Sequence, residues 1–172
     1  GIGKSPSKLD MSRILSMNEH YIKNMNENDL YNYLKEFCEN YKTKTDSREE
    51  KIKKSLNFLK NKAKTLEDIY NNAKYIIEDQ IKISSNDAEL LDNLSKKVLS
   101  DFLKEFEKLS IIKKENLEII INSLIEKHKI KFKGAGQPLR VALTGSRYGP
   151  GIYDIILSLD KNEVIKRLKA IN

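Results

Sequence analysis

A chain of 172 residues is long enough for one medium-sized domain or two small ones, each with a buried apolar core. Charged residues make up 33% of it and hydrophobic residues 39%, which is typical of a soluble, mostly helical protein. The sequence holds no apolar run long enough to cross a membrane and no signal peptide. A single cysteine, Cys38, excludes an internal disulfide and indicates a reducing compartment. These features predict a cytoplasmic protein, expected to be a monomer.

The chain is basic, with a net charge of +7 and an isoelectric point near 9.3. Such a charge permits a polyanionic partner such as RNA. Scattered lysines supply most of it, so a biased genome composition explains the charge equally well.

In the first half, apolar residues recur every three or four positions, the spacing of a helix with one buried side. Asp10 can cap a first short helix, and a second is expected from Asn28 to about Tyr41. The capping boxes Ser47-x-x-Glu50 and Thr65-x-x-Asp68 predict the starts of two more. The apolar positions after the first box are Ile52, Leu56, Leu59, Ala63 and Leu66.

The polar, cap-rich stretch 84–87 is the best candidate boundary, and it divides the chain into residues 1–84 and 85–172. A long helix is expected from there to about Leu109, and another from Lys113 to His128. Residues 129–136 are predicted to form a basic connector. The expected core stripe of the long helix is Leu91, Leu94, Val98, Phe102, and Leu103 or Phe106.

Near the end of the chain, residues 137–156 predict two short helices hinged at a loop. Pro138 suits the first turn of the first helix, and Gly145 can take the left-handed conformation that ends it. Pro150 then opens the second helix. Arg140 lies among apolar neighbours, with a side chain long enough to reach the surface.

The last predicted helix starts at another cap pattern, Asp160-x-x-Glu163. Two short alternations, 81–83 and 130–132, look like strands but are too short to outweigh the helices. The predicted fold is therefore all-α, a helical bundle or cage of two small subdomains.

No catalytic motif is found. His20 and His128 each lack a second His or Cys at metal-ligand spacing, so both are expected at the surface or in packing. The glycine-rich stretch 145–151 lacks the Lys-Ser/Thr ending of a phosphate-binding loop. Cys38 follows an apolar-spaced phenylalanine and is predicted to be buried rather than reactive.

The amino-acid sequence of this helix–loop–helix is more specific than the secondary-structure pattern that it predicts. Pro138-Leu-Arg-Val-Ala-Leu-Thr-Gly145, followed by Gly149-Pro-Gly-Ile-Tyr-Asp-Ile-Ile156, resembles the C-terminal anticodon-binding domain of bacterial-type glutamyl-tRNA synthetases. Lys4–Asp10 with Met17–Ile22 resembles the stem-contact region of that family. Lys60–Ile69 resembles the helix junction of its first anticodon-binding domain. The three segments follow the family's order over most of the chain.

The resemblance implies that the chain is a piece of a larger glutamate–tRNA ligase, and a start at Gly1 without methionine fits this. The family holds ATP and Mg in a catalytic domain with His-Ile-Gly-His-like and Lys-Met-Ser-Lys-Ser-like signatures, which this sequence lacks. The chain alone is therefore expected to bind no cofactor and to be inactive. Its expected partner is the tRNA for glutamate, with glutamine tRNA left open, and no membrane.

The resemblance also assigns RNA contacts. Anticodon bases are read as splayed single-stranded bases, and the planar fork of arginine suits their edges. The family's anticodon-reading arginine falls on Arg140, and the segment that opens the next helix falls on Gly149, Pro150 and Ile152. Lys62 occupies the basic position of the first subdomain, where lysine keeps the charge but loses the bidentate fork. The remaining basic candidates are Arg147, which with Tyr148 can stack on a base or clamp a phosphate, and Lys131 and Lys133.

Two other interpretations stay open: a free-standing helical RNA-binding module, and a helical protein-interaction scaffold. RNA binding requires the basic candidates on one face, whereas a scaffold requires an exposed apolar patch. For Arg140 the alternative is a structural ion pair with a carboxylate such as Asp154.

Overall fold

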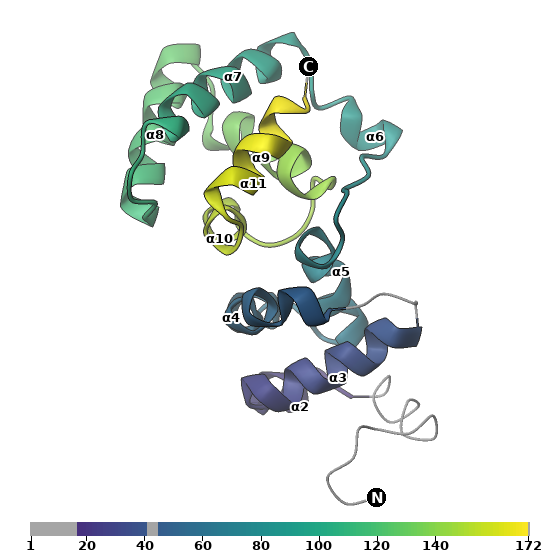
Figure 1. Cartoon of the computed structure of the whole chain (residues 1–172). Coiled ribbons are helices and arrows are strands. Elements are labelled where there is room, and N and C mark those ends of the chain that lie inside the picture. The colour runs from purple at the N-terminus through teal and green to yellow at the C-terminus, as the bar shows by residue number, and fades with distance from the viewer. Residues whose placement is uncertain (1–16, 41–44, 172) are drawn as a thin grey trace, which may run out of the picture. The chain divides into compact units, whose positions relative to one another are not determined.

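The computed structural model describes residues 17–40 and 45–171. Within these ranges the chain forms α-helices, one 3-10 turn and loops, without a strand, which confirms the all-α prediction. The chain divides into two compact units, Gly1–Asp79 and Gln80–Asn172 (Figure 1). The boundary predicted after Ser84 lies a few residues inside the second unit. The helix expected after Asp10 lies outside the described residues.

The N-terminal unit is built around three helices. Its elements are α2 (Glu19–Asn24), α3 (Glu27–Asn40), the 3-10 turn η1 (Asp46–Arg48), α4 (Glu49–Leu59) and α5 (Leu66–Ile77). Helices α3, α4 and α5 all contact one another (Figure 1). Each turns its apolar side toward the other two, as its spacing predicts. Their fully buried side chains include Leu30, Leu34, Ile52, Leu56, Leu59 and Ile69.

One of the two capping boxes of this unit forms and the other does not. The Thr65 hydroxyl accepts from the Asp68 N–H, and the Asp68 carboxylate accepts from the Thr65 N–H, both at 3.1 Å. The prediction of a capping box at Ser47 is wrong, because Ser47 lies in η1 and α4 begins at Glu49 without a side-chain cap. Arg48 donates to the Ile77 carbonyl at 2.5 Å and pairs with Asp79, a tertiary contact that no local pattern contains.

In the C-terminal unit, α9 is the central helix. The elements are α6 (Ser85–Ala88), α7 (Asn93–Glu107), α8 (Lys114–His128), α9 (Phe132–Thr144), α10 (Ile152–Ser158) and α11 (Lys161–Lys169). Helix α9 contacts α7, α8, α10 and α11 (Figure 1). Its buried residues Leu139, Val141, Ala142 and Leu143 are fully enclosed by these neighbours.

The long helix expected up to Leu109 is interrupted. Helix α6 ends at Ala88, and α7 begins after Asp92, whose carboxylate accepts from the Ser95 N–H at 2.8 Å. This cap satisfies a free donor of the new helix and fixes where it starts. Leu94 lies in the first turn of α7 and is 46% exposed, so its assignment to the core is wrong, and the core begins one turn later at Val98.

The basic connector is shorter than predicted, because α9 already begins at Phe132. Pro138 therefore lies inside the helix rather than in its first turn, where it cannot donate to the carbonyl of Gly134. The segment is nevertheless helical because Ala135, Gly136 and Pro138 are all buried. Burial against neighbouring helices therefore outweighs the preference of Pro138 for the first turn of a helix.

The last helix, α11, begins after Asp160 as predicted, but the Asp160 side chain accepts no capping hydrogen bond from the first turn. Glu163 instead accepts from Arg167 at 3.0 Å, and Arg167 also donates to the Leu143 carbonyl at 2.6 Å. Arg167 is only 8% exposed, so these partners satisfy a buried guanidinium at the end of α9.

Candidate nucleic-acid interface

The polar side of α9 carries two of the predicted contacts of this unit, Lys133 and Arg140. Lys133, Gln137, Arg140 and Thr144 recur at steps of four, three and four, so they share one side of the helix. Lys133 is exposed, and the other three are half-buried. Arg140 therefore lies at the border between core and surface, as its apolar neighbours predict.

The loop after α9 is folded by its own hydrogen bonds. Gly145 ends the helix with φ 83°, and its N–H donates to the Val141 carbonyl at 2.8 Å. The Thr144 hydroxyl lies 2.8 Å from the Arg140 carbonyl and accepts from the Ser146 N–H at 3.2 Å. The Ser146 hydroxyl in turn accepts from the Tyr148 N–H at 3.1 Å. The loop is thus a defined structure and can position a ligand.

Arg140 is held against this loop. Its Nε donates to the Pro150 carbonyl and its Nη1 to the Arg147 carbonyl, both at 3.1 Å. The predicted alternative, an ion pair with Asp154, is not what the structure shows, although these two bonds do give Arg140 a structural role. Burial lowers the pKa of Arg140, but a guanidinium stays charged in proteins. Of its five N–H donors, these two bonds leave the others for a ligand.

Arg147 ties the loop to α6. Its Nε donates to the Asp87 carboxylate at 2.7 Å and its Nη2 to the Asn86 carbonyl at 2.5 Å. The hydrogen bond raises the pKa of Arg147 and lowers that of Asp87. Arg147 is therefore engaged in the protein, while Tyr148 beside it is 78% exposed.

At the start of α10, the side chains of Pro150 and Ile152 are buried. Any RNA contact from here comes through Gly149 or through the free backbone N–H groups of the first turn, which follows the N-cap Gly151. The structure thus brings Arg140, Arg147 and residues 149–152 together in one loop region.

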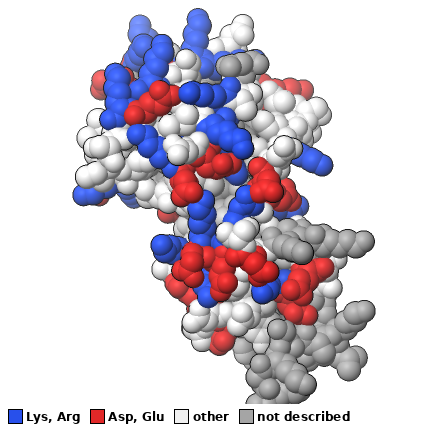
Figure 2. All heavy atoms as spheres, viewed as in Figure 1, with Lys and Arg blue, Asp and Glu red and all other residues white. Residues whose placement is uncertain are grey.

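The lysine candidates are spread more widely. Lys131 and Lys133 lie at the start of α9 and are exposed, and neither side chain has a hydrogen bond or ion pair to the described residues. Figure 2 shows Lys and Arg side chains over much of the visible face of the C-terminal unit, with acidic side chains between them. Lys62 lies in the turn between α4 and α5 of the other unit and is also exposed. The roles assigned to all these residues stay predictions.

Sequence reasoning missed two features of this region. Asp87 belongs to the stretch predicted as the domain boundary, and no linear pattern pairs it with an arginine 60 residues later. The rings of Phe132 and Tyr153 lie 6.0 Å apart, and the short alternation 130–132 had marked only a weak strand. The sequence pattern did not predict that a helix begins at Phe132, and it therefore did not predict this ring pair.

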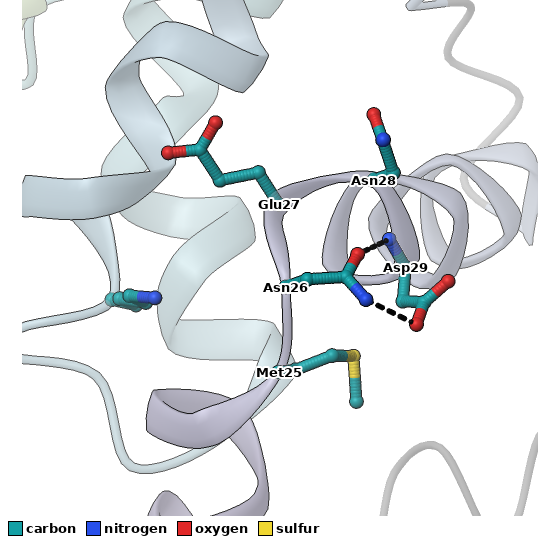
Figure 3. A pocket seen from close by; sticks show the side chains of 6 residues that line it. Met25, Asn26, Glu27, Asn28 and Asp29 are labelled. Atoms are coloured by element: carbon teal, nitrogen blue, oxygen red, sulfur yellow. Dashed lines mark hydrogen bonds between the residues drawn. The ribbon is translucent and has the colours of Figure 1, made fainter.

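An open pocket of about 610 Å³ lies in the N-terminal unit, at the start of α3 (Figure 3). The Asn26 side chain accepts from the Asp29 N–H at 2.9 Å and donates to the Asp29 carboxylate at 2.7 Å (Figure 3). Glu27 and Lys60 also line it. Asn26 and Asp29 thus satisfy each other at the start of α3, which explains these two polar groups without a ligand.

No catalytic site emerges from the described residues. Cys38 is fully buried, as predicted, and burial raises its pKa to about 12. His128 lies 2.8 Å from the Asp101 carboxylate in a contact between α8 and α7, which is a packing role. Across residues 17–40 and 45–171, no three His, Cys, Asp or Glu residues are grouped to hold a metal ion. Nor does any helix in these ranges have the length and apolar character to cross a membrane.

Comparison with known proteins agrees with this geometry. Residues 28–172 match the family described as anticodon binding domain. Glutamate–tRNA ligase from Pelagibacter ubique is 60% identical over 98% of this chain, and a glutamate–tRNA ligase from Zymomonas mobilis is 30% identical over 97%. The chain spans only about a third of the length of these relatives (36% and 35%).

The fold is also that of a solved structure. A glutamate tRNA ligase from Elizabethkingia meningosepticum superposes with a TM-score of 0.73 at 21% identity, over 90% of this chain and 30% of that one. The family match covers most of the sequence, including α9, the loop and α10. The chain therefore belongs to the family of anticodon-binding domains.

Proposed function

We propose that this chain binds the anticodon arm of a tRNA, as the anticodon-binding part of a glutamate–tRNA ligase. Its family and the names of its relatives support this reading over a free-standing RNA-binding module or a protein-interaction scaffold. The tRNA for glutamate is the proposed partner. Whether the glutamine tRNA is also accepted depends on how strictly Lys62 and Arg140 read the bases.

The geometry of Arg140 carries the proposal. Two loop carbonyls hold its guanidinium in place, and burial limits its motion, so its remaining N–H donors have a fixed direction. A splayed base offers ring nitrogens and carbonyl oxygens as acceptors for such a fork. A flexible, fully solvated arginine would lose more conformational entropy on binding the same base.

The neighbouring groups complete the contact. Backbone N–H groups at the start of α10 can bond a base edge or a phosphate, and the exposed lysines can neutralise phosphates. Arg147 supports the site by fixing the loop to Asp87. In this unit base recognition belongs to Arg140 and the loop, whereas Lys131 and Lys133 supply affinity without sequence preference.

The ligase reaction itself, attachment of glutamate to tRNA with ATP and Mg, is assigned to another part of the parent enzyme. We propose that the chain acts as a monomer in the cytoplasm, where a lone buried thiol such as Cys38 stays reduced.

The test is binding of a fluorescently labelled anticodon stem-loop of glutamate tRNA to the purified chain. The stem-loop should bind, more weakly as salt rises, and better than a stem-loop of the same length with a scrambled anticodon. Equal binding of the two would reduce the function to general affinity for polyanions. Saturable binding of ATP by calorimetry would show that a nucleotide site exists in this chain.

A further inference from the structure

Two aromatic side chains, Phe132 and Tyr153, lie together where the start of α9 meets α10. Phe132, the first residue of α9, is 45% exposed. Its ring lies 6.0 Å from that of Tyr153 on α10, tilted by 48°. Exposed aromatic rings offer flat faces on which nucleic-acid bases can stack.

The chain holds this ring in place. A Cβ at Gly136, one turn after Phe132, would lie 3.2 Å from the Phe132 ring, which shows that the ring lies close along the backbone of α9. Tyr153 supports it from α10, and the Lys114 ammonium stands 5.8 Å from the centre of the Tyr153 ring. The platform, defined as Phe132 and Tyr153, is therefore fixed by α8, α9 and α10 before any ligand arrives.

The lysines near the platform indicate which kind of ligand it would bind. Lys131 and Lys133 flank Phe132 in sequence, are exposed, and have no ion-pair partner among the described residues. Lys114 has only a long contact, 3.9 Å, with Glu118. The exposed, unpaired ammonium groups of Lys131 and Lys133, next to Phe132 in the sequence, suit a ligand that carries both phosphates and a flat face, as a single-stranded nucleotide does.

The platform also lies close to the proposed reading site. Phe132 and Arg140 belong to one helix and are separated by little more than two turns, or about 12 Å along its axis. Tyr153 lies three residues after Pro150, whose carbonyl holds Arg140. A nucleotide stacked on Phe132 would therefore be a near neighbour of the base that Arg140 contacts.

We propose that Phe132, supported by Tyr153, is a stacking platform for an unpaired nucleotide of the anticodon loop, next to the base read by Arg140. This inference rests on the proposed function. Stacking uses the flat face that every base has, so the platform contributes affinity and orientation without selecting a base.

The experiment compares the whole chain with its variants Phe132→Ala and Phe132→Leu, using the anticodon stem-loop of glutamate tRNA. In a series of these RNAs one loop base at a time is replaced by 2-aminopurine, whose fluorescence falls when the base stacks. Ile119→Ala is the matched control, because Ile119 is an apolar residue of the same unit and is 68% exposed. Circular dichroism confirms that each variant is folded.

One 2-aminopurine position should be quenched by the unaltered chain, and Phe132→Ala should abolish that quenching. Phe132→Ala should also weaken binding by on the order of tenfold. The loss should be the same for cognate and altered anticodons, since discrimination belongs to Arg140. Phe132→Leu should lose the quenching as well, and Ile119→Ala should change neither quantity.

The inference is overturned if the unaltered chain binds the stem-loop but Phe132→Ala binds it equally well. It is also overturned if Phe132→Ala changes the oligomeric state instead, because the ring would then contact protein. Failure of the unaltered chain to bind the stem-loop is a different result, which contradicts the proposed function itself.

Discussion

Gly145 ends α9 directly after the polar side that carries Arg140, and its replacement by alanine should destabilise the C-terminal unit. Its φ of +83° is a conformation that alanine adopts at a cost. A Cβ there would also lie 2.4 Å from the carbonyl oxygen of Lys82, which belongs to the backbone and cannot turn away. The end of α9 and the segment at Lys82 must therefore separate.

The left-handed backbone conformation and the clash with Lys82 together set the loss in the free energy of unfolding. The left-handed conformation alone costs about 1–2 kcal/mol, and the displaced backbone brings the total to roughly 2–4 kcal/mol. For a unit of this size, each 1 kcal/mol lowers the melting temperature by about 4–8 °C, so Gly145→Ala should lower it by at least about 8 °C. Thermal unfolding followed by circular dichroism measures the change.

Gly149→Ala is the matched control. Gly149 also has a positive φ, +135°, but a Cβ there has nothing within 4 Å. Its substitution adds backbone strain without a clash, so the melting temperature should fall by less. If Gly149→Ala proves as damaging as Gly145→Ala, the contact with Lys82 does not contribute as reasoned here.

Three further predictions concern stability and reactivity. Asp101, whose pKa is lowered chiefly by the hydrogen bond from Lys127, should stabilise the fold above its ordinary pKa near 3.8 and lose that effect as the pH falls through the lowered value. Asp101→Asn should thus lower the melting temperature at neutral pH, with a difference from the unaltered chain that shrinks in acid. A constant difference would contradict this. Cys38, fully buried with a pKa of about 12, should react with a thiol reagent near neutral pH only after unfolding in urea, and rapid reaction of the folded chain would refute its burial. Thr65→Ala should cost about 1 kcal/mol because a formed capping box is lost, whereas Ser47→Ala, in the box that does not form, should change urea unfolding by less than about 0.5 kcal/mol. Equal losses would show that capping does not explain either residue.

The sequence pattern predicted correctly those parts of the fold that depend only on residues close together in the chain. The spacing of Leu30, Leu34 and Phe37 placed α3 within a residue of its observed ends, since one buried side is what that spacing serves. The Thr65 box forms because its two partners are three residues apart and need no third element.

The failures share a different origin. The start of α9 at Phe132 depends on the burial of Ala135, Gly136 and Pro138 in a helix that contacts four others, and this burial outweighs the preference of Pro138 for a first turn. The start of α4 depends on Arg48 reaching the end of α5. Such contacts join residues far apart in the sequence, so no pattern of neighbours could reveal them.

The candidate site shows the same division. The motif around Arg140 located the loop, and the glycines and Pro150 indicated its turns. The two carbonyls that hold Arg140, and the Asp87 that holds Arg147, follow only from the path of the folded chain. The sequence therefore predicted which arginine to examine, and the structure shows what fixes its direction.

The most direct test of the account is the ratio of dissociation constants for the glutamate anticodon stem-loop and for the same stem-loop with one anticodon base changed, measured for the unaltered chain and for Arg140→Lys. Lysine keeps the charge and most of the reach but loses the planar fork. The unaltered chain should prefer the cognate loop by roughly 1–3 kcal/mol at the base that Arg140 reads, and Arg140→Lys should lose most of that preference while keeping its salt dependence. If Arg140→Lys discriminates between anticodon bases as well as the unaltered chain does, Arg140 is not the reader and the central claim fails.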